Sequence, residues 1–334
     1  MLKKYKPTLD KLTKIVGKSY VLIDEQDTRH YRQGMRFGEG KVLAVVCPGT
    51  LLEQWQALQT IIEADCVVIM QAANTGLTGG STPYGDEYDR PVIIMSTRRL
   101  QGIQVILDGK QVVCLPGATL DNLERTLKPY NREPHSVIGS SCIGASVLGG
   151  VCNNSGGALV RRGPAYTEMA LYARVNESGK LELINHLGID LGNTAEEILT
   201  RLQKQDYETS QITTQTTQLA SDNRYAHDVK QVDADSPARF NADPTRLYEA
   251  SGSAGKVCVF AVRLDTFEKV ESKVFYIGSN DHDDLTAIRR YLLTSLPSLP
   301  IAGEYIHRDA FSIGAKYGKD TFLFIERFGT VNIP

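Results

Sequence analysis

Gln71-Ala-Ala-Asn-Thr-Gly-Leu-Thr-Gly-Gly-Ser-Thr82 is the stretch that decides the fold. It follows a short apolar run at residues 66–70, which predicts a buried strand. Glycine permits positive φ and lets the backbone approach a ligand closely. Successive N–H groups in such a loop form a concave nest for an anion, and hydroxyls add donors without bulk. The stretch predicts a diphosphate cradle for a nucleotide cofactor; the alternative is an ordinary glycine-rich surface loop.

Two better-known phosphate-binding motifs do not fit this loop. It lacks the G-x-x-x-x-G-K-[ST] run of a P-loop. Its glycines, at 76, 79 and 80, do not follow G-x-G-x-x-G, and no helix pattern opens directly after them, which disfavours a Rossmann site. A cradle at this position would therefore be made by loop backbone and not by a helix N-terminus.

Length and composition are those of a globular protein with room for two domains. The 334 residues are 42% hydrophobic and 23% charged, with a formal net charge of −2. Nucleic-acid binders usually carry a basic excess, so this balance argues against such a partner. No apolar run reaches the length of a membrane span, and the N-terminus lacks a signal-peptide pattern. We therefore expect this chain by itself to be soluble and cytoplasmic.

The cysteines point away from metal and disulfide chemistry. The chain has 6 of them, without a C-x-x-C pair, and most stand among apolar or small residues. That pattern is typical of buried free thiols in a reducing compartment. We expect neither a metal site nor a disulfide framework.

Apolar patterns predict alternating strands and helices over most of the chain. Pro48-Gly49 ends a buried strand at 42–47, and Thr50 stands three residues before Glu53, which is the spacing of a capping box. The helix that follows leads to the strand before the glycine-rich loop and predicts a βαβ unit with parallel strands. Thr119 and Thr194 are expected to cap two later helices. Further strands are expected at 91–95, 104–107, 111–115, 169–175, 180–184 and 256–264, and helices at 9–16, 51–62, 120–127 and 195–204.

A second glycine-rich stretch covers residues 134–168. Its propensity for helix and for strand is low, and a packed domain holds such a segment only when something orders it. A large, flat, buried ligand would do so. The alternative is a flexible loop, but interspersed apolar residues such as Val147 and Val151 argue for burial.

The last third of the chain contains a polar region and then a second apolar one. Residues 205–236 are polar and without periodicity, which predicts a mobile excursion or linker in which His227 is solvated. Farther on, apolar runs at 273–277 and 321–325 flank a helix that Asp281 can cap. This order predicts a second domain of βαβ type.

Four segments together resemble a known family. They are Gln71-Ala-Ala-Asn-Thr-Gly-Leu-Thr78, residues 132–146, Asn153-Asn-Ser-Gly-Gly157 with residues 162–168, and residues 254–267. The chain, except for 205–236, is similar to the bacterial quinone-dependent, FAD-containing D-lactate dehydrogenases. The resemblance implies an α+β fold, in which two subdomains of the vanillyl-alcohol oxidase and p-cresol methylhydroxylase type grip FAD, followed by the start of an α/β cap domain. The implied boundaries are 1–265 for the FAD-binding domain and 266–334 for an incomplete cap.

The resemblance also implies which residues hold the FAD. The first loop would bind the diphosphate, and the second glycine-rich stretch would line the flavin, whose ring edge takes hydrogen bonds from nearby backbone. Val259 would touch the cofactor from a later strand through its backbone. The implied cofactor-binding residues are Ala72, Ala73, Asn74, Thr75, Gly76, Gly80, Ser81, Gly139, Ser146, Gly156 and Val259.

For function, the resemblance implies an enzyme that oxidises D-lactate to pyruvate and passes the electrons to a membrane quinone. Family members are longer and bind the cytoplasmic side of the inner membrane peripherally through a basic segment. We therefore expect this chain to be truncated at its C-terminal side, with the membrane contact and much of the substrate pocket in the missing part. Neither a metal nor nucleic acid is implied.

The catalytic base is not fixed by the sequence. A base must take the hydroxyl proton of the acid, and a cation must hold its carboxylate. His307 is a candidate base with Arg308 as a carboxylate clamp; the alternative is a surface pair in a loop. His135 could face the flavin or make a structural hydrogen bond. Two further hypotheses stay open: a non-catalytic or incomplete FAD-binding fragment, and a dehydrogenase of another 2-hydroxy acid.

Overall fold

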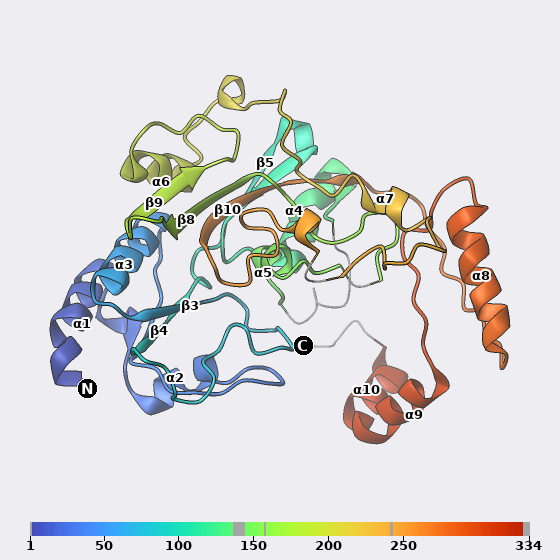
Figure 1. Cartoon of the computed structure of the whole chain (residues 1–334), viewed down its shortest axis with the longest axis horizontal. Coiled ribbons are helices and arrows are strands. Elements are labelled where there is room, and N and C mark those ends of the chain that lie inside the picture. The colour runs from blue at the N-terminus through green and yellow to red at the C-terminus, as the bar shows by residue number, and fades with distance from the viewer. Residues whose placement is uncertain (1, 136–143, 157, 241–242, 330–334) are drawn as a thin grey trace.

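The computed structural model describes residues 2–135, 144–156, 158–240 and 243–329 (Figure 1). The first subdomain is built on a four-stranded sheet in the order β1-β2-β4-β3, in which β2, β4 and β3 are parallel and β1 is antiparallel to β2. Its strands are β1 Val21–Leu22, β2 Ala44–Val46, β3 Val67–Gln71 and β4 Val92–Ser96. Its helices are α1 Leu2–Val16, α2 Glu25–Arg32 and α3 Leu51–Glu63.

The second subdomain is built on a five-stranded antiparallel sheet in the order β5-β6-β10-β8-β9. Its strands are β5 Ile103–Ile106, β6 Gln111–Cys114, β8 Ala170–Val175, β9 Leu181–Asn185 and β10 Cys258–Asp265. Its helices are α4 Leu120–Leu127, α5 Val147–Cys152 and α6 Ala195–Lys204, and a short ribbon pairs β7 Arg132–Glu133 with β11 Phe267–Glu268. The mixture of helices and two sheets confirms the predicted α+β class.

Three threonine caps fix where helices begin, as their spacing predicted. Thr50, Thr119 and Thr194 each accept a hydrogen bond from the backbone N–H three residues on, at 3.1, 3.2 and 3.2 Å. At the first of these helices, a carboxylate oxygen of Glu53 accepts from the N–H of Gly49, the residue before the cap, at 2.6 Å. Each threonine bond satisfies an N–H that a helix start leaves without a partner.

A shared core joins the two subdomains. Leu12 of α1, Ile61 of α3 and Phe260 of β10 are fully buried in one hydrophobic cluster, together with residues of α6 and β8. The indole of Trp55 meets the Phe260 ring edge-on, with centroids 6.2 Å apart. A second cluster covers the opposite face of the antiparallel sheet and includes α4 and α5. Because one core holds residues from both sheets, the loops between them are held in a fixed relation.

The polar region at 205–236, for which mobility stays a prediction, is anchored to the second subdomain at several points. Leu219 donates its N–H to a Glu168 carboxylate at 2.9 Å, and the Ser221 hydroxyl donates to Asp265 at 2.6 Å. Ile212 is buried, and the short helix α7, Tyr225–Asp228, lies on this segment. Side-chain hydrogen bonds, which leave no apolar period in the sequence, anchor the segment to the second subdomain. His227 is exposed, as expected.

The two strands predicted near the C-terminus are wrong. Residues 273–277 have no regular secondary structure, and residues 321–325 lie inside a helix. The helices of this region are α8 His282–Thr294, α9 Arg308–Tyr317 and α10 Lys319–Phe328, and Figure 1 shows them beside the two sheets. A short apolar run fits a strand or a helix, and it forms a strand only where a neighbouring strand accepts it. In the described part of this region no such neighbour is present.

Within the described ranges, no helix has both the length and the apolar character that crossing a membrane requires.

Candidate cofactor site

The glycine-rich loop after β3 has the donors of an anion cradle. The backbone N–H groups of residues 72–81 donate to no described residue, although the flanking strand β3 pairs with β4 along its whole length. No atom lies within 4 Å of where a Cβ would stand on Gly76 or Gly80, so these two residues face open space. A run of unpaired N–H groups beside open glycines forms a nest for negative charge. The residues present therefore fit the diphosphate of a dinucleotide.

The polar side chains of this loop hold its shape. The Asn74 amide donates to the carbonyl of Gln33 at 2.7 Å, and its oxygen accepts from the Ser81 hydroxyl at 2.8 Å. The Gln71 amide donates to the carbonyls of Tyr31 and Ser81 at 2.8 and 2.7 Å. These side chains are therefore engaged within the protein. We therefore predict that Asn74 and Ser81 contact a cofactor through their backbone N–H groups.

A second loop braces the cradle, and sequence reasoning missed it. Gly38 has φ +96°, and a Cβ there would lie 2.2 Å from the Thr82 hydroxyl. Gly79 has φ +73°, and a Cβ there would lie 2.9 Å from the Phe37 ring. The N–H of Gly85 donates to the carbonyl of Glu39 at 2.8 Å. Both glycines are required by a close approach of two loops, and the glycine spacing at 34, 38 and 40 was the available signal.

In the second subdomain, Ser146 begins the short helix α5. Its hydroxyl accepts from the N–H of Gly149 at 3.0 Å, which caps the helix. Val147 and Val151 are buried, as the apolar residues of this stretch predicted. The helix itself was not predicted, because the glycines lower its propensity and only the cap and the packing stabilise it. Gly139 lies outside the described residues.

Gly156 and Val259 complete the predicted set, and each has a close neighbour. A Cβ on Gly156 would lie 2.4 Å from a guanidinium nitrogen of Arg239. Val259 lies at a register shift of β10 against β8, a β-bulge that interrupts the ladder. Its carbonyl accepts from the Gln54 amide at 3.2 Å.

Gln54 links the two subdomains, and sequence reasoning missed it. It belongs to α3 but reaches β10, and it is fully buried. Its side-chain oxygen has no partner among the described residues. A polar residue inside the apolar stripe between Leu51 and Leu58 was the signal that could have identified it. A buried, unpaired acceptor costs free energy, which is a common mark of a site that a ligand completes.

His135 is a buried neutral group. Burial lowers its pKa from 6.5 to about 4, with a smaller opposing effect of the Arg162 carbonyl. The Arg162 guanidinium donates to the carbonyl of Pro134 at 2.9 Å, lies 4.3 Å from the Phe267 ring centroid and pairs with Glu133. His135 therefore stands in a well-packed structural setting.

His307 begins helix α9 and is half-exposed. Its Nδ1 accepts from the N–H of Asp309 at 3.1 Å, so this nitrogen caps the helix. Its ring stacks on His282, with centroids 6.0 Å apart and planes at 8°. No contact between His307 and the cradle is present among the described residues. The predicted cofactor residues that the structure describes thus lie in the loop after β3, around α5 and in β10, while the candidate base lies at the start of α9.

A family model and two solved structures first identify the class of fold to which the chain is similar. Residues 42–181 match the family model described as FAD binding domain, a range that includes the cradle and Ser146. The fold is similar to that of a p-cresol methylhydroxylase, with a TM-score of 0.51 at 12% identity over 80% of this chain and 44% of that one. It is also similar to an alkyldihydroxyacetonephosphate synthase, with a TM-score of 0.52 at 12% identity over 79% and 40%. The chain therefore has the fold of FAD-binding proteins of the p-cresol methylhydroxylase type.

Sequence relatives narrow this class. The chain resembles the quinone-dependent D-lactate dehydrogenase of Haemophilus influenzae, with 61% identity over 98% of this chain. It resembles the protein of the same name from Escherichia coli with 56% identity, again over 98%. The chain spans 58% of the length of each of these relatives. Residues 274–334 match a family model described as D-lactate dehydrogenase, membrane binding. The predicted resemblance and the FAD cofactor are confirmed.

Proposed function

We propose that the protein catalyses the FAD-dependent oxidation of D-lactate to pyruvate, with a quinone as the electron acceptor. The proposal rests on the anion cradle in the loop at 72–81, whose backbone N–H groups have no partner among the described residues. It is supported by the similarity of the chain to two quinone-dependent D-lactate dehydrogenases. Bound FAD supplies a two-electron acceptor. D-lactate would lose two electrons and two protons to become pyruvate, and a quinone would gain both to become a quinol.

The residues of this chain would perform the binding part of this reaction. Loop 72–81 would hold the diphosphate through its backbone, while Gln71, Asn74 and Ser81 keep the loop in shape through side-chain bonds. Ser146, Gly156 and Val259 would line the cofactor from the second subdomain. The shared core between the sheets would exclude water from the side of the cofactor that faces it.

Domain boundaries and membrane contact belong to the same proposal. A FAD-binding domain over residues 1–265 and a cap region from 266 onward are compatible with the end of the antiparallel sheet at Asp265. Contact with the cytoplasmic side of the inner membrane would come through the region from residue 274 onward, which the membrane-binding family model matches.

His307 is the proposed base, and a variant tests it. Nδ1, which accepts the backbone N–H of Asp309, is the acceptor nitrogen of the neutral ring, so His307 would take the substrate proton there after releasing this cap, while Nε2 carries the ring proton. His307→Ala is expected to lower flavin reduction by about 10²-fold or more, as the loss of a general base does. His282→Ala, which removes only the stacked ring, is the matched control. Full turnover in His307→Ala would remove this residue from the proposal.

The direct test of function is anaerobic. The purified protein, loaded with FAD, is mixed with D-lactate or L-lactate while the visible flavin absorbance is followed. Loss of absorbance with D-lactate only, and its return on adding a water-soluble quinone, is the expected result. A flavin that responds to neither acid would contradict the proposed activity for this chain.

A second candidate function is FAD binding without turnover. It is favoured by the exposure of the apolar side chains at 274–277, among them Tyr276 at 95%, because such exposure is typical of a surface that contacts a membrane and not of a region that encloses a substrate. In the same experiment this candidate predicts a bound flavin whose spectrum D-lactate leaves unchanged.

A further inference from the structure

The connection between α8 and α9 returns to the second subdomain. The N–H of Val160 donates to the carbonyl of Ile301 at 3.0 Å, and the N–H of Gly303 donates to the carbonyl of Ala158 at 2.9 Å. An isolated antiparallel bridge lies between these two bonds. Residues 299–303, which we call the strap, are thus paired with the chain opposite them as in a short antiparallel ladder.

Arg161 adds a charged contact to the strap. Its guanidinium donates through Nε and Nη2 to the carbonyl of Leu299, at 3.1 and 2.8 Å. A hydrogen bond from a charged donor is stronger than one between neutral groups. Leu299 is buried and precedes Pro300, which biases its backbone toward an extended form. The sequence therefore favours an extended strap, and Arg161 anchors it.

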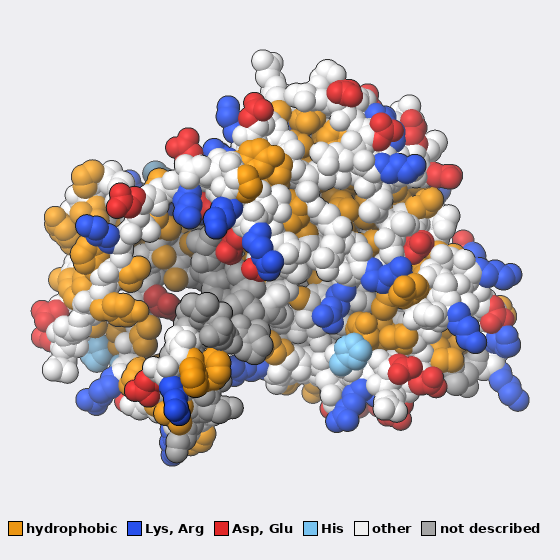
Figure 2. Space-filling model, turned by 180° about the vertical axis from the view of Figure 1, so that it is seen from behind, with side chains coloured by type: hydrophobic (Ala, Val, Ile, Leu, Met, Phe, Trp, Pro, Cys, Tyr) orange, Lys and Arg blue, Asp and Glu red, His pale blue; other side chains and the backbone are white. Residues whose placement is uncertain are grey.

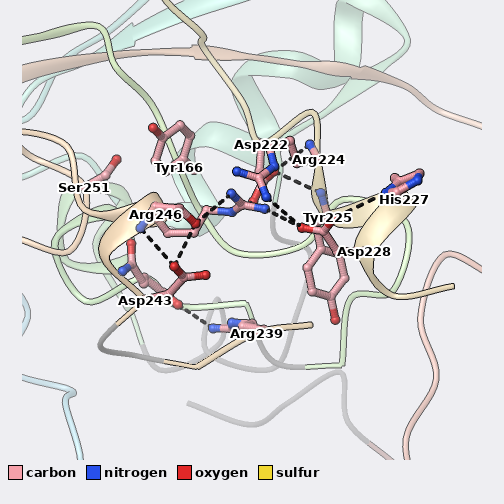
Figure 3. A network of polar contacts seen from close by, with 12 residues as sticks. Tyr166, Asp222, Arg224, Tyr225, His227, Asp228, Arg239, Asp243, Arg246 and Ser251 are labelled. Atoms are coloured by element: carbon pink, nitrogen blue, oxygen red, sulfur yellow. Dashed lines mark hydrogen bonds and ion pairs between the residues drawn. The ribbon is translucent and has the colours of Figure 1, made fainter. Parts of the chain in front are cut away.

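Figure 3 shows a different use of arginine in the same part of the molecule. Arg246 pairs with Asp222 at 2.6 Å and with Asp228 at 3.0 Å, and both carboxylates belong to the polar region at 205–236. These pairs hold that polar region in place. Arg161 reaches instead into the C-terminal region, so its contact affects how that region lies against the second subdomain.

The strap lies between two parts of the proposed site. Ala158, which accepts from Gly303, is two residues from Gly156, and Gly156 is proposed to line the FAD. Gly303 is four residues from His307, the proposed base, and four residues span no more than about 14 Å. The bond between Ala158 and Gly303 therefore limits how far His307 can lie from the glycine-rich stretch at 134–168.

We propose that the strap positions His307 relative to this glycine-rich stretch, and that Arg161 is the positioning residue that keeps the strap in place. The inference rests on the proposed function, because it concerns the placement of the proposed base. Arg161 then acts through His307 and not by contact with the substrate.

Hydrogen exchange of the FAD-loaded protein, followed by mass spectrometry, tests whether the strap is paired in solution. Peptides that contain the N–H groups of Val160 and Gly303 should exchange slowly in the wild type and at least tenfold faster in Arg161→Ala. Arg161→Lys keeps a cationic donor and is expected to exchange nearly as slowly as the wild type. Arg290→Ala is the matched control, since it removes only an exposed ion pair with Asp233 that also joins the C-terminal region to the rest of the chain.

Anaerobic flavin reduction by D-lactate tests whether the strap acts through His307. Arg161→Ala is expected to slow reduction at least tenfold at unchanged FAD affinity, because a misplaced base reacts slowly, and Arg161→Lys should restore most of the rate. The double variant of Arg161→Ala with His307→Ala should be no slower than His307→Ala alone. A positioning residue contributes nothing once the group that it positions is absent.

The outcomes separate this inference from the proposed activity. Fast exchange of the strap in the wild type would overturn the inference, and so would a full rate of reduction in Arg161→Ala. Additive losses in the double variant would show that Arg161 acts apart from His307 and would overturn it as well. A wild-type flavin that D-lactate does not reduce would contradict the proposed activity, while slow exchange that Arg161→Ala accelerates would still support the strap.

Discussion

The two subdomains and the C-terminal region contain similar apolar runs but use them differently. Phe260, in the central strand β10, is fully buried between helices and sheets, whereas Phe275 is 79% exposed. Residues 274–277 are exposed throughout, and so are several large apolar side chains of α9 and α10. The space-filling view shows hydrophobic side chains on the left-hand part of the molecule, where α8, α9 and α10 lie (Figure 2).

The difference shows that an apolar run favours burial but does not determine whether other parts of the chain are in place to bury it. In β10 the need is met by strands on both sides and by Trp55 of α3. At 274–277 the described residues offer no such partner. Stability should therefore depend strongly on residues 2–268 and weakly on residues 269–329, and the following predictions test this contrast.

The largest effect is expected from paired phenylalanine truncations. Phe260→Ala should lower the free energy of unfolding by about 3–5 kcal/mol, because it opens a cavity in the shared core. Phe275→Ala should change it by no more than about 0.5 kcal/mol, as exposed substitutions do. Urea unfolding followed by tryptophan fluorescence, which reports Trp55 beside Phe260, measures both. Equal losses in the two variants would contradict the contrast.

The next effect is a pH dependence inside the second subdomain. His135 has a pKa of about 4 in the folded protein against 6.5 ordinarily, because burial disfavours its charged form. The unfolded chain therefore binds more protons between these values, and stability falls as pH drops from 6.5 to 4, by up to about 1.4 kcal/mol per pH unit. His135→Gln should flatten this part of the stability–pH profile. The exposed His227→Gln should leave the profile unchanged; a flattening there would contradict the assignment.

A smaller effect separates cofactor binding from folding. Gly80 faces open space, so Gly80→Ala should leave the melting temperature of the FAD-free protein unchanged. The new methyl group would occupy the mouth of the cradle and should weaken FAD about tenfold, which is roughly 1.4 kcal/mol. Gly278→Ala, also in open space but in the C-terminal region, is the control. Equal FAD affinity in all three proteins would show that the diphosphate binds elsewhere.

The smallest effect is expected from two helix caps. Thr50 accepts from the N–H of Glu53 at 3.1 Å, and Asp281 accepts from the N–H of Asp283 at 2.9 Å. Thr50→Ala should lower the free energy of unfolding by about 1 kcal/mol, since α3 packs in the core. Asp281→Ala should fray α8 without changing the unfolding of the two subdomains. A comparable loss from Asp281→Ala would show that α8 folds together with them.

Local patterns in the sequence predicted much of this fold. The strand before Gln71, the βαβ unit and the three threonine caps rest on contacts a few residues apart, and each is present. The strands at 273–277 and 321–325 were predicted wrongly, because a short apolar run becomes a strand only beside a neighbouring strand. The contacts that anchor residues 205–236 also join distant parts of the chain. Ser221 is anchored by Asp265, 44 residues away, and no local pattern encodes such a bond.

The candidate site shows the same division. The open glycines and the engaged side chains of the cradle follow from the composition of one loop. The brace by Phe37 and Gly38, the Gln54 contact to Val259 and the position of Arg239 against Gly156 join residues far apart in sequence. Of these three contacts, only that of Gln54 with Val259 crosses between the two subdomains, and the other two depend on packing within one subdomain.

The most direct test of the account is an equilibrium titration of the FAD-free chain with FAD, followed by flavin fluorescence and absorbance. The account predicts one FAD per chain, a shifted flavin spectrum, and weaker binding in Gly80→Ala than in Gly278→Ala. An absence of binding to folded protein, or binding that neither glycine affects, would contradict the claim that residues 72–81 and the second subdomain build the cofactor site.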